Sequence, residues 1–225
     1  MHILNPFILG GYDIPVANLK HYYKLNANAN DSVGVSNGTA TDVTYTSGHT
    51  GDAATFNGST SRISLPNNLW TNPAEIAVTG FFKADNTSSE YRVVALNDNT
   101  GSPYVLIRLN NTTAGRIGMI VNNDTSLNEV TTDSYTVTDW VHIGIGADEN
   151  GSADLYVNGV YVGQDATFGN FTQVTTNGNY FGAGRNGSTA RFDGQMFGVG
   201  IWDVKPTAQQ FSDIFDKQDS GQHLV

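Results

Sequence analysis

The sequence contains no cysteine and few basic residues, and these two absences exclude several classes of protein. Without cysteine there is no disulfide framework, thiolate metal site or cysteine nucleophile, although the redox compartment stays open. Lysine and arginine together number 11 against 21 aspartates and glutamates, which gives a net charge of −10. A chain this acidic, with no basic run, lacks the electrostatic footprint that binds a phosphate backbone or an anionic membrane. We therefore expect neither nucleic acid nor membrane partners.

Long hydrophobic runs are also missing. No apolar segment approaches the roughly 18 residues that a transmembrane helix needs. Residues 1–15 carry no cationic region before their short apolar stretch, whereas a signal peptide has one. On the premise that the chain begins naturally at Met1, we expect a protein that is not exported through a signal peptide.

The abundant residues are those of strands and tight turns. There are 25 glycines, 24 asparagines and 24 threonines, and 17 of the 21 acidic residues are aspartates. Asn, Asp and Gly favour turns, and Thr, Val and Tyr favour strands. Hydrophobic residues make up 39% of the chain, which is enough for a core. The composition therefore predicts an all-β protein with many turns.

Short apolar segments separated by turn clusters follow from residue 19 onward, at the spacing of a sandwich or barrel. The predicted strands cover residues 20–25, 41–46, 53–56, 60–65, 76–84, 91–97, 104–109, 115–121, 127–130, 140–147, 153–157, 160–164, 179–183 and 192–204.

The dipeptide Asn158-Gly159 predicts a two-residue type I′ hairpin turn, because both residues accept a positive φ. Such a turn would pair Val157 with Val160, Tyr156 with Tyr161 and Leu155 with Val162. The alternation of strands would then place the aliphatic pairs on one face and the tyrosine pair on the other.

Three segments are expected: an apolar arm over residues 1–18, one domain over 19–217 and a tail over 218–225. The arm is more apolar than a free tail, so we expect it to dock on the domain itself, on a neighbouring subunit or on a larger assembly. Near the end of the domain, Thr207 can cap a helix together with Gln210. The following apolar residues fall on one face of that helix, namely Phe211, Ile214 and Phe215.

Four blocks of sequence, in order, resemble the laminin G-like, concanavalin A-like domains of the pentraxin-like branch, over about residues 19 to 217. The blocks are residues 22–25 followed by 30–34, residues 51–59 with 62–66, residues 140–143 through 155–159, and residues 181–186 followed by 192–194 and the final helix.

The resemblance implies an all-β fold, a concanavalin A-like jelly-roll β-sandwich of two antiparallel sheets with one short C-terminal helix. Two departures stand out. Phe81 occupies a strand position where the family usually has tryptophan, and keeps its core role. Met196-Phe197-Gly198 replaces an acidic pair, which puts in doubt any function that the pair serves.

The carboxylates and histidines show no catalytic pattern. Retaining glucanases need two carboxylates about 5 to 5.5 Å apart, but the four glutamates are isolated in the sequence, and no strand shows Asp-x-Asp or Asp-x-Glu. The histidines are scattered, and we interpret His142 as a hydrogen-bonded histidine of a structural strand. We therefore expect a non-enzymatic protein without catalytic residues.

Asp31 and Asp193 are the candidate metal ligands. If each predicted strand reverses direction, the loop 26–40 and the start of the strand after 185–190 share one end of the sandwich. The resemblance also implies acidic residues near a calcium site at these positions, so we expect a bound calcium between them, in a structural role. The alternative is an Asx turn at Asp31 and a strand-edge aspartate at Asp193.

The same count gathers the loops 98–103, 122–126 and 148–152 at the opposite end. Their amides and carboxylates suit sugar hydroxyls or calcium. The candidate carbohydrate-binding residues are Asn97, Asp98, Asn99, Asn122, Asn123, Asp124, Asp148 and Asn150. The alternative is that these residues only form turns. Tyrosines that could stack on a sugar ring include Tyr104, Tyr135 and the pair Tyr156 and Tyr161.

Together these features predict a bacteriophage virion surface protein, on a tail, spike or capsid, whose lectin-like domain binds host surface polysaccharide. Such a protein would contact neighbouring virion subunits through its arm and form a homo-oligomer. The alternatives are a structural assembly module without sugar binding, and an extracellular carbohydrate-binding domain of a secreted enzyme or adhesin.

Overall fold

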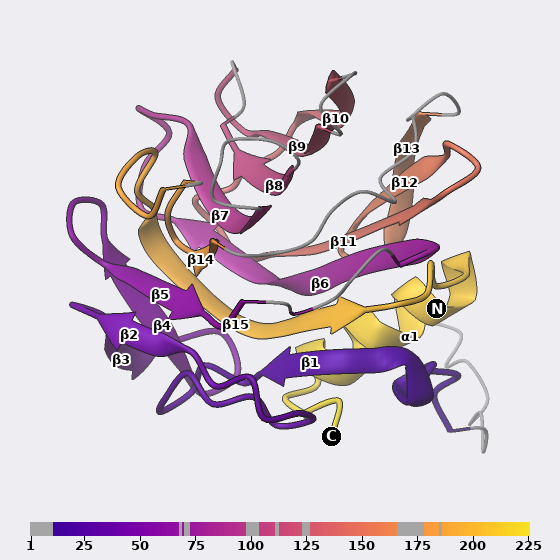
Figure 1. The fold of residues 1–225 in the computed structure, drawn as a ribbon, viewed down its shortest axis with the longest axis horizontal. Coiled ribbons are helices and arrows are strands. Elements are labelled where there is room, and N and C mark those ends of the chain that lie inside the picture. The colour runs from indigo at the N-terminus through magenta and orange to yellow at the C-terminus, as the bar shows by residue number, and fades with distance from the viewer. Residues whose placement is uncertain are drawn as a thin grey trace, which may run out of the picture.

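The chain folds into two antiparallel sheets packed face to face, with one helix near the C-terminus (Figure 1). The computed structural model describes residues 11–67, 69, 73–97, 104–110, 113–122, 127–165, 178–184 and 186–225. Each sheet turns one face inward, and the aliphatic and aromatic residues between the sheets form the main core. The two-sheet sandwich and the C-terminal helix confirm the fold class predicted from the sequence.

Sheet A has the order β13-β12-β11-β6-β15-β4-β3, and β1 also pairs with β15. Its strands are β1 (Leu19–Tyr23), β3 (Thr44–Ser47), β4 (Asp52–Asn57), β6 (Glu75–Ala84), β11 (Val141–Asp148), β12 (Ala153–Val157), β13 (Val160–Asp165) and β15 (Asp193–Trp202).

Sheet B has the order β10-β9-β8-β7-β14-β5-β2. Its strands are β2 (Thr39–Thr41), β5 (Arg62–Leu65), β7 (Tyr91–Asn97), β8 (Tyr104–Leu109), β9 (Arg116–Asn122), β10 (Leu127–Ser134) and β14 (Asn179–Phe181).

One edge of β15 is shared by two strands. β4 pairs with its first part, up to Met196, and β1 pairs with its last part, from Val199. Between them lies an irregularity of the ladder at Gly198, whose φ of 63° is in the left-handed region. In the segment 196–198, where the family resemblance implied an acidic pair, the neighbour of β15 therefore changes from β4 to β1.

The sequence predicted a single strand over 41–46, and this prediction is wrong. The structure has two short strands there, β2 in sheet B and β3 in sheet A. Asp42 lies between them with a φ of 50°, and this left-handed residue turns the chain from one sheet to the other. Alternating β-forming residues on both sides of Asp42 concealed the corner.

The predicted hairpin at Asn158-Gly159 is confirmed in its turn and its first two pairs. Both residues have positive φ, of 50° and 74°, and the neighbouring valine and tyrosine pairs face each other as expected. The third pair is wrong, because an irregularity shifts the register and Leu155 faces Gly163 instead of Val162.

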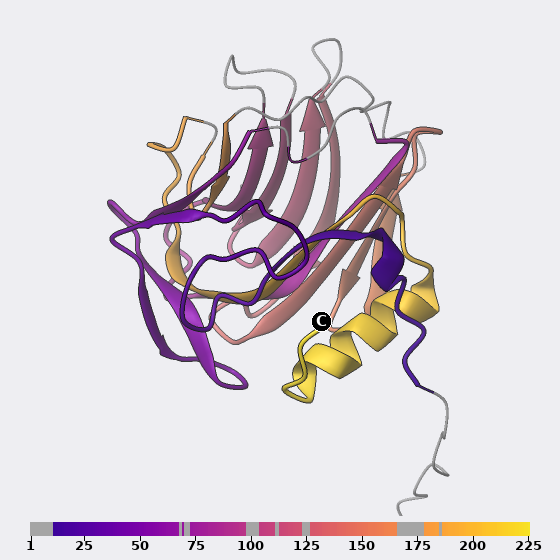
Figure 2. The same ribbon diagram turned by 60° about the horizontal axis from the view of Figure 1, so that its bottom comes forward.

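Helix α1 (Ala208–Asp219) packs against the outer face of sheet A (Figure 2). Thr207 and Gln210 form the predicted capping box. Phe211 and Ile214 are buried together with Tyr22, Tyr156 and Trp202 of the sheet. None of the described helices is long and apolar enough to cross a membrane.

The described part of the N-terminal arm docks on its own domain. Ile14 packs against the cluster beneath helix α1, and the backbone N–H of Asp13 donates to Asp213 Oδ2 at 2.7 Å. A short 3₁₀ helix, η1 (Val16–Asn18), then leads into β1. Of the three docking partners that the sequence left open for the arm, residues 11–18 use the domain itself.

Candidate functional site

The outer face of sheet B carries most of the arginine side chains, together with two tyrosines. Because side chains alternate along a strand, the core residues Ile63, Ile107 and Ile117 place their neighbours on the outer face. The outward residues include two tyrosines and four arginines, namely Tyr104, Tyr180, Arg62, Arg92, Arg108 and Arg116. Ala95, Leu106 and Ile120 form a small buried cluster at the middle of this face, with Tyr104 partly buried beside them.

Arg108 joins two glutamates that lie far apart in the sequence. Its Nη1 is 2.9 Å from Glu90 Oε2, and its Nη2 is 3.0 Å from Glu129 Oε1. Arg92 Nε adds a longer ion pair of 3.5 Å to Glu90 Oε1. The guanidinium thus holds both carboxylates at once, each by a different nitrogen.

Arg191, just before β15, lies beside the start of β5 in sheet B. Its Nη1 donates to the carbonyl oxygens of Thr60 and Ser61, at 3.1 and 3.2 Å. Its segment lies along β7, where the N–H of Arg92 donates to the carbonyl of Ala190 at 3.2 Å. Burial, together with the positive charge of Arg62, lowers the pKa of Arg191. Arg191 thus bonds the two residues that directly precede Arg62 in the sequence.

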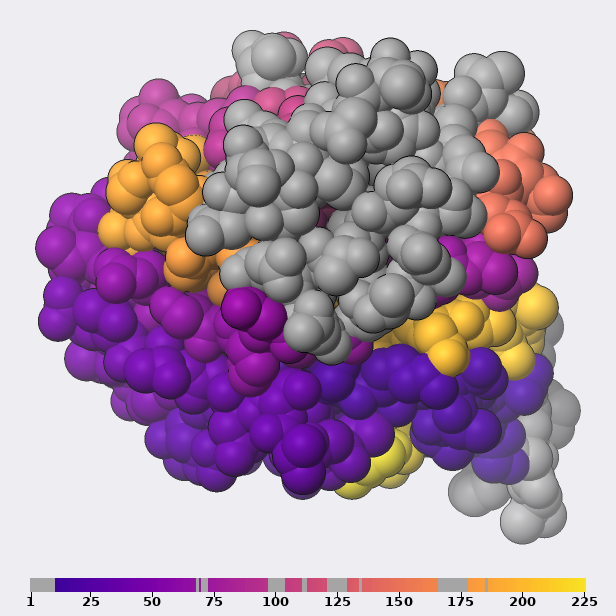
Figure 3. Space-filling view, in the orientation of Figure 1, coloured from indigo at the N-terminus to yellow at the C-terminus, as the bar shows by residue number. Residues whose placement is uncertain are grey.

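A polar cleft of about 400 Å³ opens beside these groups, and we call it the Asp193 cleft. Its lining residues are Gly58, Asn86, Ser88, Ser89, Glu90, Tyr91, Ala190, Arg191 and Asp193. They come from the β4–β5 turn, from the β6–β7 loop and the start of β7, and from the segment that leads into β15 together with the first residue of that strand. In the space-filling view, the orange segment that includes this approach to β15 lies at the surface beside purple segments from earlier in the chain (Figure 3).

Asn86 organises the β6–β7 loop that forms one wall of the cleft. Its Oδ1 accepts hydrogen bonds from the backbone and hydroxyl of Ser88 and from the hydroxyl of Tyr91. Its Nδ2 donates to Asp193 Oδ2 at 3.0 Å. The same loop forms one wall of a second hollow of about 250 Å³, on the side of Asn110 and Thr113. Ser88, Ser89 and Glu90 line both hollows, so this loop presents polar groups to two sides.

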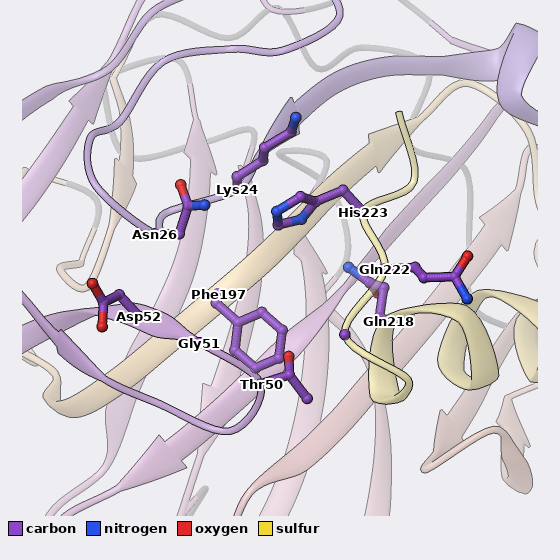
Figure 4. A pocket seen from close by; sticks show the side chains of 10 residues that line it. Lys24, Asn26, Thr50, Gly51, Asp52, Phe197, Gln218, Gln222 and His223 are labelled. Atoms are coloured by element: carbon purple, nitrogen blue, oxygen red, sulfur yellow. The ribbon is translucent and has the colours of Figure 1, made fainter.

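A third cavity lies on the opposite side of the molecule, between β1, the β3–β4 turn and the end of helix α1 (Figure 4). Its walls include Lys24, Asp52 and His223, with the ring of Phe197 between them (Figure 4). Its volume is only about 50 Å³, which is well below the roughly 300 Å³ at which small-molecule pockets begin. The Asp193 cleft is therefore the better candidate for a ligand site.

Asp31, a predicted metal ligand, is a structural carboxylate. Its side chain is completely buried, and both oxygens accept hydrogen bonds. Oδ1 accepts from the backbone N–H groups of Tyr22 and Val33, and Oδ2 accepts from Ser36 and from His21 Nδ1. Burial opposes the ionised form of Asp31, but these hydrogen bonds outweigh it and hold the pKa below its ordinary value. The bond to Val33 is the Asx turn that the sequence allowed as the alternative.

Asp193, the other predicted metal ligand, lies far from Asp31. Asp31 bridges to Tyr23, which faces Val199, and Val199 lies six positions after Asp193 along β15. At about 3.3 Å per residue, that is about 20 Å along the strand. The expectation that one calcium ion lies between these two carboxylates is therefore incompatible with the fold.

Among the described residues, no three histidine, aspartate or glutamate side chains converge as metal ligands would. Calcium binding stays a prediction. A thermal melt with and without calcium tests it.

The predicted carbohydrate-binding residues have mixed outcomes. Asp98, Asn99, Asn123 and Asp124 lie outside the described residues. The backbones of Asn97 and Asn122 are described, and both face Tyr104 across the ladders on either side of β8. The strand count that placed these two positions side by side is therefore correct.

Asp148 stabilises a turn, as the alternative interpretation held. Its Oδ1 accepts from the backbone of Asn150 at 3.0 Å, and its Oδ2 lies 3.2 Å from Lys205 Nζ. Burial opposes ionisation of Asp148, but hydrogen bonds from Ser152 and Lys205 lower its pKa overall. Asn150 is exposed in the same turn.

The chain belongs to the concanavalin A-like lectin/glucanases superfamily, because the model of this family matches residues 57–212, more than half of the sequence. This match confirms the concanavalin A-like, laminin G-like resemblance, and the pentraxin-like branch stays a prediction. No curated protein matches the chain with significant similarity.

Solved structures with the same fold include domain 4 of AbnA, a GH43 extracellular arabinanase from Geobacillus stearothermophilus, in complex with arabinotriose. It has a TM-score of 0.71 and 21% identity, and the match covers 88% of this chain and 98% of that domain. The binding domain of Paraclostridial Mosquitocidal Protein 1 has a TM-score of 0.73 and 15% identity, over 90% of this chain and 52% of that one.

The binding domain of botulinum neurotoxin serotype D has a TM-score of 0.71 and 15% identity, over 89% of this chain and 51% of that one. This chain thus spans about half the length of the two toxin domains and nearly all of the arabinanase domain. None of the three is a bacteriophage protein.

Proposed function

We propose that the protein is a non-catalytic glycan-binding module, and that its ligand occupies the Asp193 cleft and the adjoining outer face of sheet B. The observation that carries this proposal is the cleft itself, whose volume of about 400 Å³ lies within the range of roughly 300 to 1,000 Å³ typical of ligand pockets.

The lining chemistry suits sugar hydroxyls. A hydroxyl group both donates and accepts hydrogen bonds, so a sugar needs donors and acceptors within reach. The cleft supplies carboxylate acceptors at Glu90 and Asp193, a guanidinium donor at Arg191 and hydroxyls at Ser88 and Ser89. Tyr180 on the adjoining face adds an aromatic ring, which offers an apolar surface with a polar hydroxyl.

The other face of the sandwich is less suited to a ligand. Helix α1 covers part of the outer face of sheet A, whereas none of the described helices packs on sheet B. The arabinanase domain of the same fold, solved with arabinotriose, gives an example of a sugar-bound relative. It supports a carbohydrate ligand for this chain as well.

The arrangement of the glutamates supports binding rather than hydrolysis. Glu90 and Glu129, which are isolated in the sequence, meet at Arg108. Retaining hydrolysis requires two carboxylates that flank the glycosidic bond. Here both carboxylates instead bond the guanidinium of Arg108, which lies between them.

The similar structures favour the alternative of an extracellular carbohydrate-binding domain over the virion surface protein. They comprise one domain of an extracellular enzyme and two toxin binding domains. A virion location, homo-oligomerisation and contacts to neighbouring subunits through the arm of residues 1–18 stay predictions. Light scattering of the chain with and without residues 1–18 tests the assembly role, and an unchanged mass would count against it.

A glycan array followed by titration of the bound sugar tests the binding function. Ser89 is exposed and lines both hollows, so Ser89→Trp fills them without disturbing the core. Asn150→Trp is the matched control at the opposite end of the sandwich, where the sequence predicted the site. We expect Ser89→Trp to abolish binding and Asn150→Trp to retain it. The reverse result would move the site to the loops around residue 150, and an array without any bound glycan would refute the proposal.

A further inference from the structure

Arginine and lysine are segregated between the two sheets. Four arginines lie on strands of sheet B, at Arg62, Arg92, Arg108 and Arg116, and Arg191 lies in the segment along β7. Arg185 is outside the described residues. The five lysines lie on the other side, next to or on β1, on β6, before α1 and within it, at Lys20, Lys24, Lys83, Lys205 and Lys217. The proposed ligand face therefore carries guanidinium groups and no described lysine.

The guanidinium groups on this face differ in their partners. Arg92 and Arg108 are matched by Glu90 and Glu129. In the described part of the chain, none of the ion pairs involves Arg62, Arg116 or Arg191. The buried Nε of Arg191 has no hydrogen-bond partner among the described groups.

Arg191 donates to the two backbone carbonyl oxygens directly before Arg62, so its guanidinium lies at the start of β5 beside Arg62. The positive charge of Arg62 accordingly acts on Arg191. Neighbouring like charges repel each other, and an anion between them relieves the repulsion. Arginine also presents a planar fork of donors that matches the oxygens of a carboxylate or sulfate, which lysine does not. The arrangement is therefore suited to an anionic group rather than to a neutral hydroxyl.

The carboxylates of the cleft are already engaged. Glu90 bonds Arg108, and Asp193 accepts a hydrogen bond from Asn86. The guanidinium of Arg108 reduces the repulsion between Glu90 and an incoming anion. The partner of Asp193 is the amide of Asn86, and not another carboxylate that would add to the repulsion.

We propose that the glycan bound on this face is acidic, and that Arg62 and Arg191 together bind its carboxylate or sulfate group. This inference rests on the proposed glycan-binding function and specifies the class of its ligand. The chain as a whole has a net charge of −10 and therefore repels polyanions. We therefore expect an acidic glycan to bind only at this face.

A glycan array that presents uronates, sialylated glycans, sulfated glycans and neutral glycans gives the first test. Bound glycans that all carry carboxylate or sulfate support the proposal, and the array separates the two groups. Binding of neutral glycans alone overturns the proposal but leaves the glycan-binding function intact. No binding to any glycan refutes the function itself, so the two failures are distinguishable.

Calorimetry with the strongest acidic glycan gives the second test. Arg62→Gln and Arg191→Gln should each weaken binding by about tenfold or more, because each removes a hydrogen bond to a charged group. Lys83→Gln, which removes the same charge from sheet A, should leave the affinity unchanged. For a carboxylate-bearing glycan, methyl esterification of the ligand should weaken wild-type binding to the same degree.

Thermal melts check that the variants fold. Arg191→Gln also loses bonds to the backbone of Thr60 and Ser61, so Arg62→Gln, which has no such described bond, decides the outcome if Arg191→Gln is unstable. Unchanged affinity in Arg62→Gln, or an equal loss in Lys83→Gln, would overturn the proposal.

Discussion

His21 Nδ1 lies 2.7 Å from Asp31 Oδ2, and this buried contact fixes the long connection between β1 and β2 to the first strand. The other ring nitrogen, Nε2, lies 3.0 Å from the carbonyl oxygen of Leu69. The carboxylate also accepts backbone hydrogen bonds from both sides of the connection, at Tyr22 and Ser36. In this long connection, the side chain of one aspartate thus provides hydrogen bonds that backbone pairing would provide in a short turn.

Replacement of this aspartate should cost much stability. Asp31→Asn removes the charge and places an amide NH2 group against donors, so we expect a loss of about 3 kcal/mol in the free energy of unfolding. Asp193→Asn is the matched control, because Asp193 is only partly buried, and we expect less than about 1 kcal/mol. Urea denaturation measures both. Equal losses would show that Asp31 has no special structural role.

His142 should make the fold sensitive to mild acid. Burial lowers its pKa from 6.5 to about 4 in the folded chain, and its Nδ1 has no partner among the described groups. The unfolded chain therefore binds a proton more readily, and stability is full above pH 6.5 and falls as the pH decreases toward 4. The expected loss across this window is about 3 kcal/mol.

His142→Gln removes the titrating group and keeps a donor for the side chain of Gln218, which His142 Nε2 faces at 3.1 Å. The free energy of unfolding of this variant, measured by urea denaturation from pH 7 to pH 4, should vary much less than that of the wild type. A variant with the same pH dependence as the wild type would contradict the assignment to His142.

The β12–β13 turn offers a test of local structure. Asn158 has a φ of 50°, and its Oδ1 accepts the backbone N–H of His142 at 2.8 Å. Asn158→Ala loses this bond and keeps the unfavourable backbone conformation, so it should destabilise the fold by about 1–2 kcal/mol. Asn150→Ala, in an exposed turn without a positive φ, should change stability by less than about 0.5 kcal/mol. Similar melting temperatures for the two variants would contradict this interpretation.

Gly198 should tolerate no side chain. A Cβ there would lie 2.3 Å from Gln218 Nε2, and the φ of 63° is strained for any other residue. We expect Gly198→Ala to cost about 2–3 kcal/mol by denaturation. Gly163→Ala is the control, because its φ is not in the left-handed region and the nearest atom is 3.7 Å away. A small effect at both positions would show that the β15 irregularity adapts easily.

Local patterns predicted the features that depend on neighbouring residues. The Asn158-Gly159 turn, the Thr207 cap and the apolar face of the final helix are each set by residues a few positions apart, and the structure confirms them. The register beyond the hairpin failed at Leu155, because a bulge is decided by packing across the sheet rather than by the turn.

The candidate site is built by contacts between residues that are far apart in the sequence, and sequence patterns therefore did not predict most of it. Glu90 and Glu129 looked isolated, and they meet at Arg108 only because β7, β8 and β10 lie in one sheet. The strand count correctly grouped Asn97 with Asn122, but it could not tell how far along β15 Asp193 lies from Asp31. The arginines of the predicted strands were the signal that could have indicated this face.

The pairing of β1 with the end of β15 has a consequence for synthesis of the chain. Among the described strands of this domain, β1 is translated before the others, and its partner β15 is translated after them. Until then, Leu19 and Tyr22, both buried in the finished domain, lack the strand that shelters them. Such long-range pairing slows folding and leaves the unfinished chain open to aggregation. β1 can therefore take its place in sheet A only after β15 has been translated.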